Sequence, residues 1–432
     1  MTGIPRIFTT LVCNVVRKLL PLYDPGRRAF VAALALAAAT LSGLPTHSSA
    51  VVRTEDYAVA SWAAAPVSAA PADANRINNQ TVRNVIHLSV GGDKVRVKFS
   101  NRYGTSALVL TGASVAIRSG GESIVPGTSR TLTFGGLPAA SFTIPIGAEL
   151  VSDWADLRVA DQTDLAVDIY LTSDTSASTS PVTLHNARPA GQILSYLATG
   201  NQLGAPTLPT EATRTQWYFL IGVDIAAPEA VGAIVAFGDS ITDGTASTLN
   251  ANARWPDFLA RRIIAGQSGI RPMGVPNLGI GGNRVLNGGT GEPALTRFDR
   301  DALVQTGAQY IIVLEGINDI SGGATAAAII QGHQQLIKRA HARGMKIYGA
   351  TLTTFFNAIA MNPQREVARQ ALNNWIRTSG AYDGVIDFEA AVRDPANPLR
   401  MRPEFDSGDT LHPNSAGYEA MANAIDLNLF KP

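Results

Sequence analysis

The stretch Val231-Gly-Ala-Ile-Val-Ala-Phe-Gly-Asp-Ser240 is an apolar run that ends abruptly in a polar turn. A short apolar run of this kind, ended by glycine, predicts a strand that is buried on both faces of a parallel sheet. Ser240 then stands at the carboxyl end of that strand. Because open α/β sheets bind ligands beyond the carboxyl ends of their strands, we expect Ser240 to face a ligand site.

The chain after residue 231 alternates between strand-like and helix-like segments. This alternation predicts an α/β domain over residues 231–432, with five parallel strands in a three-layer α/β/α arrangement. The expected strands are 233–237, 275–280, 310–314, 346–351 and 384–388, and the expected helices are 256–265, 325–343, 364–378 and 415–427.

A second polar segment, Asp409-Thr-Leu-His412, supplies what a serine nucleophile needs. An alcohol attacks poorly unless a base takes its proton, and an acid must orient that base. We therefore predict Ser240 as nucleophile, His412 as base and Asp409 as the orienting acid.

Two further segments offer hydrogen-bond donors at the ends of the next two predicted strands. They are Asn277-Leu-Gly-Ile-Gly-Gly-Asn283 and Gly316-Ile-Asn-Asp319. The N–H of Gly282 and the amide of Asn318 are suitable donors for an oxyanion hole. Each segment alone has a simpler interpretation, as a tight turn or a helix cap. All four in one order, each at a predicted strand end, indicate an ester hydrolase.

These segments resemble the sequence blocks of the SGNH, or GDSL-type, hydrolases, at residues 237–244, 277–283, 315–319 and 409–413. The resemblance covers roughly residues 231–430 and implies a flavodoxin-like catalytic domain without a cofactor or a metal. It implies the triad Ser240, Asp409 and His412, with the N–H of Ser240, Gly282 and Asn318 in the oxyanion hole. Gly281 competes with Gly282, but counting from Asn277 favours Gly282. The Gly-x-Ser-x-Gly signature of α/β-hydrolases is absent.

The residues before 226 are rich in short strand-like runs and poor in helical periodicity. They predict a β-sandwich or jelly-roll-like domain over residues 82–225, after a lead-in over residues 51–81. Residues 85–90 and 94–99 flank Gly91-Gly92-Asp93, which predicts a β-hairpin. The whole chain is similar to a bacterial secreted subgroup of GDSL-type esterases with an N-terminal β domain. Members of that subgroup act on sugar acetates, aryl esters or short-chain lipids.

Residues 1–50 are typical of a signal peptide. A basic segment containing Arg27-Arg28 precedes an apolar run, and small residues end at Ala50. Arg27-Arg28 resembles a twin-arginine export motif, so Sec and twin-arginine export both stay open. The alternative is a membrane anchor, but the run is short for a span and no basic stop-transfer group follows it. We expect export to the periplasm or the outside, without a stable membrane anchor. The lone cysteine, Cys13, lies in this segment, so the mature chain would have no thiol.

The amino-acid composition narrows the classes of molecule that the chain is expected to bind. With a net charge of +1 and 16% charged residues, the chain has no basic field that would hold nucleic acid. His333 and His341 lie on one predicted helix and are interpreted as solvated or capping residues rather than metal ligands. We expect a secreted carboxylic-ester hydrolase that acts on short acyl groups, including acetylated carbohydrates. A broad aryl esterase or lipase, and a carbohydrate-binding or acyl-transferring protein, are the alternatives. The oligomeric state stays open.

Overall fold

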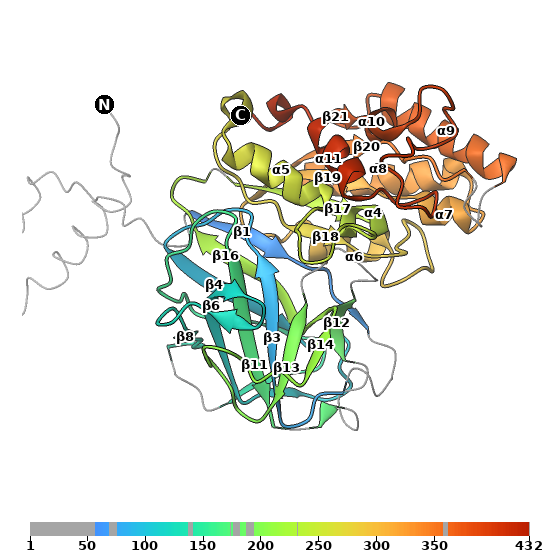
Figure 1. Ribbon diagram of the computed structural model, residues 1–432. Helices are drawn as coiled ribbons and strands as arrows, with labels where there is room; N and C mark the ends of the chain where they lie inside the picture. The colour runs from blue at the N-terminus through green and yellow to red at the C-terminus, as the bar shows by residue number, and fades with distance from the viewer. Residues whose placement is uncertain are drawn as a thin grey trace, which may run out of the picture. The chain divides into compact units, whose positions relative to one another are not determined.

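The computed structural model describes residues 57–68, 76–136, 141–172, 174–175, 182–186, 194–230, 232–356 and 362–431. These residues belong to one compact unit, in which a β-rich region precedes an α/β region (Figure 1). The predicted signal peptide at residues 1–50 lies outside the described residues and stays a prediction. Among the helices that are described, none has the length and apolar character needed to span a bilayer.

The α/β region is built on the predicted parallel sheet of five strands. These are β17 (Ala233–Gly238), β18 (Asn277–Gly279), β19 (Ala308–Leu314), β20 (Lys346–Ala350) and β21 (Gly384–Ile386). Their order is β18-β17-β19-β20-β21, which is the flavodoxin-like order. All six residues of β17 are buried, as expected of a central strand covered on both faces. The predicted fold class is confirmed.

The four predicted helices are present. They are α5 (Trp255–Ile264), α8 (Ala326–Ala342), α9 (Pro363–Thr378) and α11 (Ser415–Asn423). The side chains of Thr325 and Asn362 cap α8 and α9, which explains why these starts were predictable. The structure adds α6 (Ala294–Asp301) and three short helices, α4 (Ser240–Asp243), α7 (Ile317–Ser321) and α10 (Phe388–Val392). Helix α5 packs on α11, whereas α8 packs on α6 and α9, so the helices form two groups.

The β-rich region consists of antiparallel sheets. One joins β1 (Ala58–Ala63), β16 (Leu220–Ala226), β4 (Lys94–Ser100) and β10 (Glu149–Val151), in that order. A larger sheet centres on β3 (Gln80–His87), β11 (Asp164–Leu171), β6 (Gly112–Gly120) and β13 (Ser195–Thr199). A small sheet contains β2 (Val67–Ser68), β12 (Thr183–Asn186) and β15 (Gln216–Tyr218). In β4, Val95, Val97 and Phe99 are buried and alternate with half-buried residues, the pattern of a strand with one core face.

The predicted hairpin around Gly91-Gly92 is wrong. Strand β3 pairs with β11 and β13, whereas β4 pairs with β16 and β10, so the two strands belong to different sheets. The glycines are needed for close approach instead. A Cβ at Gly91 would lie 2.3 Å from the Val159 carbonyl oxygen, and one at Gly92 would lie 2.2 Å from that of Ala226.

The predicted lead-in over residues 51–81 also needs correction. Within it, β1 is fully buried and pairs antiparallel with β16, and β3 already begins at Gln80. The Ala-rich composition of this segment concealed a strand, because small apolar residues carry little strand signal of their own. Residues 58–63 are therefore part of the β-rich region.

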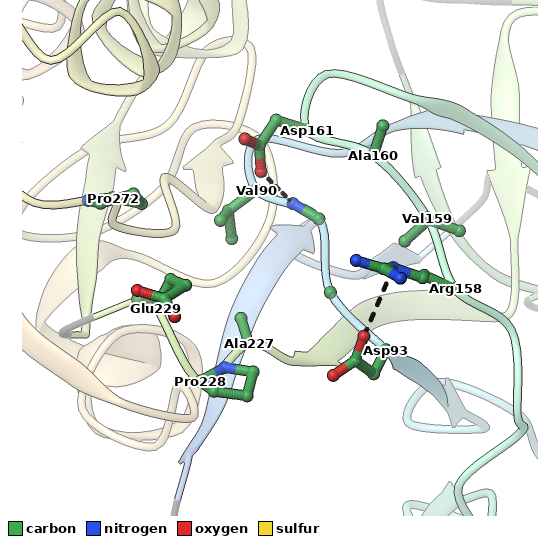
Figure 2. A pocket seen from close by; sticks show the side chains of 13 residues that line it. Val90, Asp93, Arg158, Val159, Ala160, Asp161, Ala227, Pro228, Glu229 and Pro272 are labelled. Carbon is green, nitrogen blue, oxygen red and sulfur yellow. Dashed lines mark hydrogen bonds and ion pairs between the residues drawn. The ribbon is translucent and has the colours of Figure 1, made fainter.

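A pocket of about 650 Å³ lies beside Gly91 and Gly92, which connect β3 to β4 (Figure 2). Its walls come from residues 90–93, 158–161 and 227–230 and from Pro272. The carboxylate of Asp161 accepts the N–H of Gly91 at 2.6 Å, and Arg158 pairs with Asp93 at 3.6 Å. None of the predicted site residues lines this pocket.

Candidate active site

The predicted nucleophile lies in a tight strand-to-helix turn. Ser240 directly follows β17 and the cap residue Asp239, and it is the first residue of α4. The Asp239 carboxylate accepts the N–H of Ile241 at 2.9 Å, which caps the helix. A Cβ at Gly238 would lie 2.3 Å from both the Leu314 carbonyl oxygen and the Thr242 hydroxyl, so only glycine fits there. The side chain of Ser240 is thereby fixed at the edge of the sheet.

The structure brings the three predicted triad residues into one hydrogen-bonded series. Ser240 Oγ lies 2.9 Å from His412 Nε2, and His412 Nδ1 lies 2.6 Å from Asp409 Oδ2. Because the carboxylate can only accept, Nδ1 carries a proton and Nε2 accepts from the serine hydroxyl. Thr410 has a φ of 63°, a left-handed turn that returns the chain so that His412 faces Asp409.

The carboxyl group of Asp409 is held ionised by this same loop. Its burial would raise its pKa, but hydrogen bonds from the His412 ring and from the N–H groups of His412 and Leu411 lower it below its ordinary value. The two N–H groups lie 2.7 Å and 2.9 Å from Asp409 Oδ1. The side chain of Asp409 is still 48% exposed, whereas that of His412 is 14% exposed. The series therefore runs from a nearly buried serine outward to a surface carboxylate.

The two predicted donor segments leave the sheet at the same level as Ser240. Gly238 of β17 pairs with Gly279 of β18 and with Leu314 of β19, so the three following loops begin side by side. Gly282 has a φ of 79°, and its N–H has no hydrogen-bond acceptor among the described residues. The Asn318 amide donates one N–H to the carbonyl oxygen of Asn283 at 2.9 Å.

Two residues that the sequence interpretation did not place in the site tie these loops together. The Asp319 carboxylate accepts the N–H groups of Val285 and Leu286 at 2.7 and 3.0 Å, which joins α7 to the loop after Gly282. Arg297, fully buried on α6, donates to the carbonyl oxygens of Gly238 and Leu278 and to the Asn283 side chain. Pro293 just before α6 was the local signal that could have revealed this helix.

Buried carboxyl groups lie beneath the nucleophile turn. Asp239 and Glu315 are fully buried, and neither oxygen of Glu315 has a hydrogen-bond partner among the described residues. Burial raises the pKa of Glu315, and the carboxyl groups of Asp239 and Asp319 raise it further, against the effect of Arg297. Burial likewise raises the pKa of Asp239. The pKa of Glu315 therefore lies well above its ordinary value.

The two histidines of α8 differ from each other. His341 is half-exposed and lies 2.9 Å from Asp383, near the end of the helix. His333 is fully buried, which corrects its interpretation as a solvated or capping residue. Its Nδ1 lies 2.7 Å from the Tyr382 hydroxyl, and burial lowers its pKa to about 4. Across the described ranges, no group of three His, Cys, Asp or Glu side chains is arranged to hold a metal ion.

Comparison with known proteins gives one family. Residues 236–420 match the model of the GDSL-like lipase/acylhydrolase family. No curated protein matches the chain. A member of the lipolytic protein G-D-S-L family from Veillonella parvula is 19% identical, with 44% of this chain and 94% of that one covered and a TM-score of 0.36. A GDSL-like lipase from Bacteroides thetaiotaomicron is 20% identical, with 46% and 87% covered and a TM-score of 0.34. The family match carries the assignment that follows.

Proposed function

We propose that this chain, whose residues 236–420 belong to the GDSL-like lipase/acylhydrolase family, hydrolyses carboxylic esters through an acyl-Ser240 intermediate. Membership of this family makes the chain an ester hydrolase. The observation that best supports the proposed mechanism is the hydrogen-bonded series from Ser240 through His412 to Asp409. No cofactor is needed, because these side chains can make every proton transfer of the reaction.

In the proposed acylation step, Ser240 Oγ attacks the ester carbonyl carbon while His412 Nε2 takes the hydroxyl proton. The carbonyl oxygen becomes an oxyanion, which the N–H groups of Ser240 and Gly282 and the Asn318 amide stabilise. His412 then gives its proton to the alkoxide oxygen as the ester C–O bond breaks. The alcohol leaves and the acyl group stays on Ser240.

In the proposed deacylation step, a water molecule takes the place of the alcohol. His412 removes a proton from the water as its oxygen attacks the acyl carbon, and the proton passes to Ser240 Oγ when the bond to the serine breaks. The ionised Asp409 stabilises the positively charged His412 ring in both steps. The products are a carboxylic acid and the free enzyme.

For the substrate, we propose short acyl groups, above all acetyl, on alcohols that include carbohydrates. The exposure of Asp409 supports this proposal, because a triad that ends at the surface leaves room for a bulky alcohol. The composition of residues 1–50 supports export, where polymeric substrates would be met. A broad aryl esterase or lipase, or transfer of the acyl group to a sugar, would use the same acyl-Ser240 intermediate.

A panel of esters and a covalent probe test the proposal. We expect p-nitrophenyl acetate and acetylated xylan to be hydrolysed with a higher kcat/KM than long-chain p-nitrophenyl esters. A serine-directed phosphonate should label Ser240, as mapped by peptide mass spectrometry. Labelling of a different serine would refute the assigned nucleophile. Fastest turnover of long-chain esters, with activation at an oil–water interface, would replace the short-acyl proposal with a lipase.

A further inference from the structure

One histidine of the β-rich region reaches the helix that carries the nucleophile. His185 lies on β12, 3% exposed, and its Nε2 is 3.0 Å from Asp243 Oδ1. Its Nδ1 is 2.7 Å from the carbonyl oxygen of Ala65. Asp243 is equally buried and is the last residue of α4, three positions after Ser240.

The two partners of His185 determine its charge. A carbonyl oxygen can only accept a hydrogen bond, and so can an ionised carboxylate, so each ring nitrogen must donate a proton. The ring is then an imidazolium. Burial lowers the pKa of His185, but the carboxylate of Asp243 and the carbonyl of Ala65 outweigh burial and raise it above its ordinary value.

The surroundings of the ring come from several elements. Asp243 faces it from α4, and Arg254, the residue before α5, carries a like positive charge that lowers the pKa of His185. The Trp217 ring of β15 lies 5.6 Å away, centroid to centroid. The imidazolium is therefore shielded from water, and its charge is balanced by Asp243. Within such a site a charge-assisted hydrogen bond is strong, and its loss is costly.

Helix α4 is held against the sheet at its other residues too. The Asn277 side chain donates to the carbonyl oxygen of Thr242 at 2.7 Å. A Cβ at Gly279 would lie 2.2 Å from the Asp243 nitrogen, so the end of β18 packs directly on the backbone of α4. The Tyr418 hydroxyl donates to the Thr245 carbonyl just after the helix, at 2.7 Å. His185 adds to these contacts an anchor from the β-rich region.

We propose that His185 is a positioning residue for ester hydrolysis, which holds α4, and with it Ser240 Oγ, in line with His412 by donating to Asp243. The inference rests on the proposed role of Ser240 as nucleophile. It gives the β-rich region a positioning role in catalysis, because a misplacement of about 1 Å at a reacting group can cost roughly 10²-fold in rate.

The inference predicts a loss of activity at alkaline pH. When His185 loses its proton, one ring nitrogen faces an acceptor with nothing to donate, so the contact with Asp243 or Ala65 is lost. Because the folded-state pKa is raised, the contact is complete below the ordinary histidine value of about 6.5 and is lost as the pH rises through the raised value. The wild-type kcat should therefore fall on an alkaline limb.

The test compares two identical substitutions in the full chain. His185→Gln should lower kcat by about 10- to 100-fold with little change in KM, and should slow phosphonate labelling of Ser240 by a similar factor. It should also remove the alkaline limb. His87→Gln is the matched control, because His87 also pairs with a carboxylate, Asp164 at 2.7 Å, within the β-rich region. That variant should keep the wild-type kcat and labelling rate.

Two further measurements keep the inference open to refutation. Asp243→Asn should lower kcat, and His185→Gln should add little in its background, since both remove the same contact. Nitrogen-15 NMR of the histidine rings in the wild type should show one buried imidazolium at pH 7, and a neutral His185 ring would overturn the inference. If Ser240→Ala abolishes activity while His185→Gln keeps the wild-type kcat and alkaline limb, His185 is not a positioning residue. If Ser240→Ala stays active, the proposed nucleophile itself is wrong.

Discussion

Each region of the molecule holds a buried carboxyl group, and the surroundings of these two groups differ. In the β-rich region, the buried guanidinium of Arg83 meets the buried carboxylate of Asp168 through two hydrogen bonds of 2.7 and 2.8 Å, and the Gly204 N–H adds a third contact to that carboxylate. In the α/β region, Glu315 lies fully buried with no hydrogen-bond partner among the described residues. The Asp168 carboxylate is paired, whereas Glu315 has no such partner, although the α/β region also holds paired buried charges such as Arg369 and Glu389, which lie 2.7 Å apart.

The difference separates two uses of burial. A fully paired buried charge leaves no polar group without a partner and fixes one arrangement of strands. Buried acids with raised pKa values collect at functional sites, where local stability is sacrificed to place a reacting group. Glu315 and Asp239 lie on the two strand ends that carry Asn318 and Ser240. The following predictions test this contrast.

The largest effect is expected at the nucleophile. Ser240→Ala should lower kcat by roughly 10⁴-fold or more, because it removes the hydroxyl that lies 2.9 Å from His412 Nε2. The free energy of unfolding should change little, since the variant loses one hydroxyl and keeps the Asp239 cap. Ester turnover and urea unfolding measure the two quantities. Full activity of the alanine variant would show that Ser240 is not the nucleophile of the α/β region.

The opposite result is expected for the Arg83–Asp168 pair of the β-rich region. Arg83→Met leaves the carboxylate of Asp168 buried and unpaired, which should reduce the free energy of unfolding by about 3–5 kcal/mol. The kcat of the protein that remains folded should be unchanged. Lys94→Met is the matched control, because its pair with Asp156 is exposed and should add no measurable stability. Equal urea midpoints for the two variants would contradict the contrast.

Asn318 tests the oxyanion donors. Asn318→Ala should lower kcat by roughly 10²–10³-fold with little change in KM, because its amide is needed mostly when the oxyanion forms. The same amide also donates to the carbonyl oxygen of Asn283. Asn318→Asp is therefore a second variant, because its side chain keeps the size of asparagine but lacks the N–H donor. A large rise in KM at constant kcat would instead make Asn318 a contact to the bound ester.

The smallest effect is expected at Glu315. Burial, with Asp239 nearby, raises its pKa, so the folded protein keeps a proton that the unfolded chain releases above about pH 4.3. Wild-type stability therefore falls as the pH rises from that value, until the folded-state pKa is passed. Glu315→Gln has no such proton to lose. Near pH 6, its free energy of unfolding should therefore rise relative to that of the wild type by at most about 1.4 kcal/mol for each pH unit. Parallel stability curves from urea unfolding at several pH values would show that Glu315 is not neutral.

Sequence predicted the α/β region well because its signals are local. A central parallel strand such as β17 is a continuous apolar run, and helices such as α8 and α9 begin at capping side chains next to them in sequence. The same locality applies to the predicted triad, since Asp409 and His412 share one loop. Their hydrogen-bonded series with Ser240 forms because the loop before α11 meets the turn that follows β17.

The β-rich region escaped prediction in detail because its partners are distant. Strand β3 pairs with β13, more than a hundred residues later, and no local pattern announces that pairing. The Gly91-Gly92 pair was interpreted as a hairpin turn, but glycine is required at these two positions because other backbone segments pack tightly against them. His185 is a single histidine in a short strand, and only the folded chain places it against Asp243. Long-range contacts, together with the weak strand propensity of the Ala-rich β1, limited the prediction.

The pairing of β1 with β16 has a consequence for how the protein is made. Ala58 pairs with Ala226, 168 residues later. The Ala60 N–H donates to the carbonyl oxygen of Thr306, which lies still further along the chain. At roughly 5–20 residues per second, a nascent chain would hold its first apolar strand without a partner for on the order of 10–30 s. During that interval the exposed strand edge is a template for aggregation. The first described strand to leave the ribosome is thus among the last to be enclosed, and a chaperone that covers residues 58–63 would protect the chain during that interval.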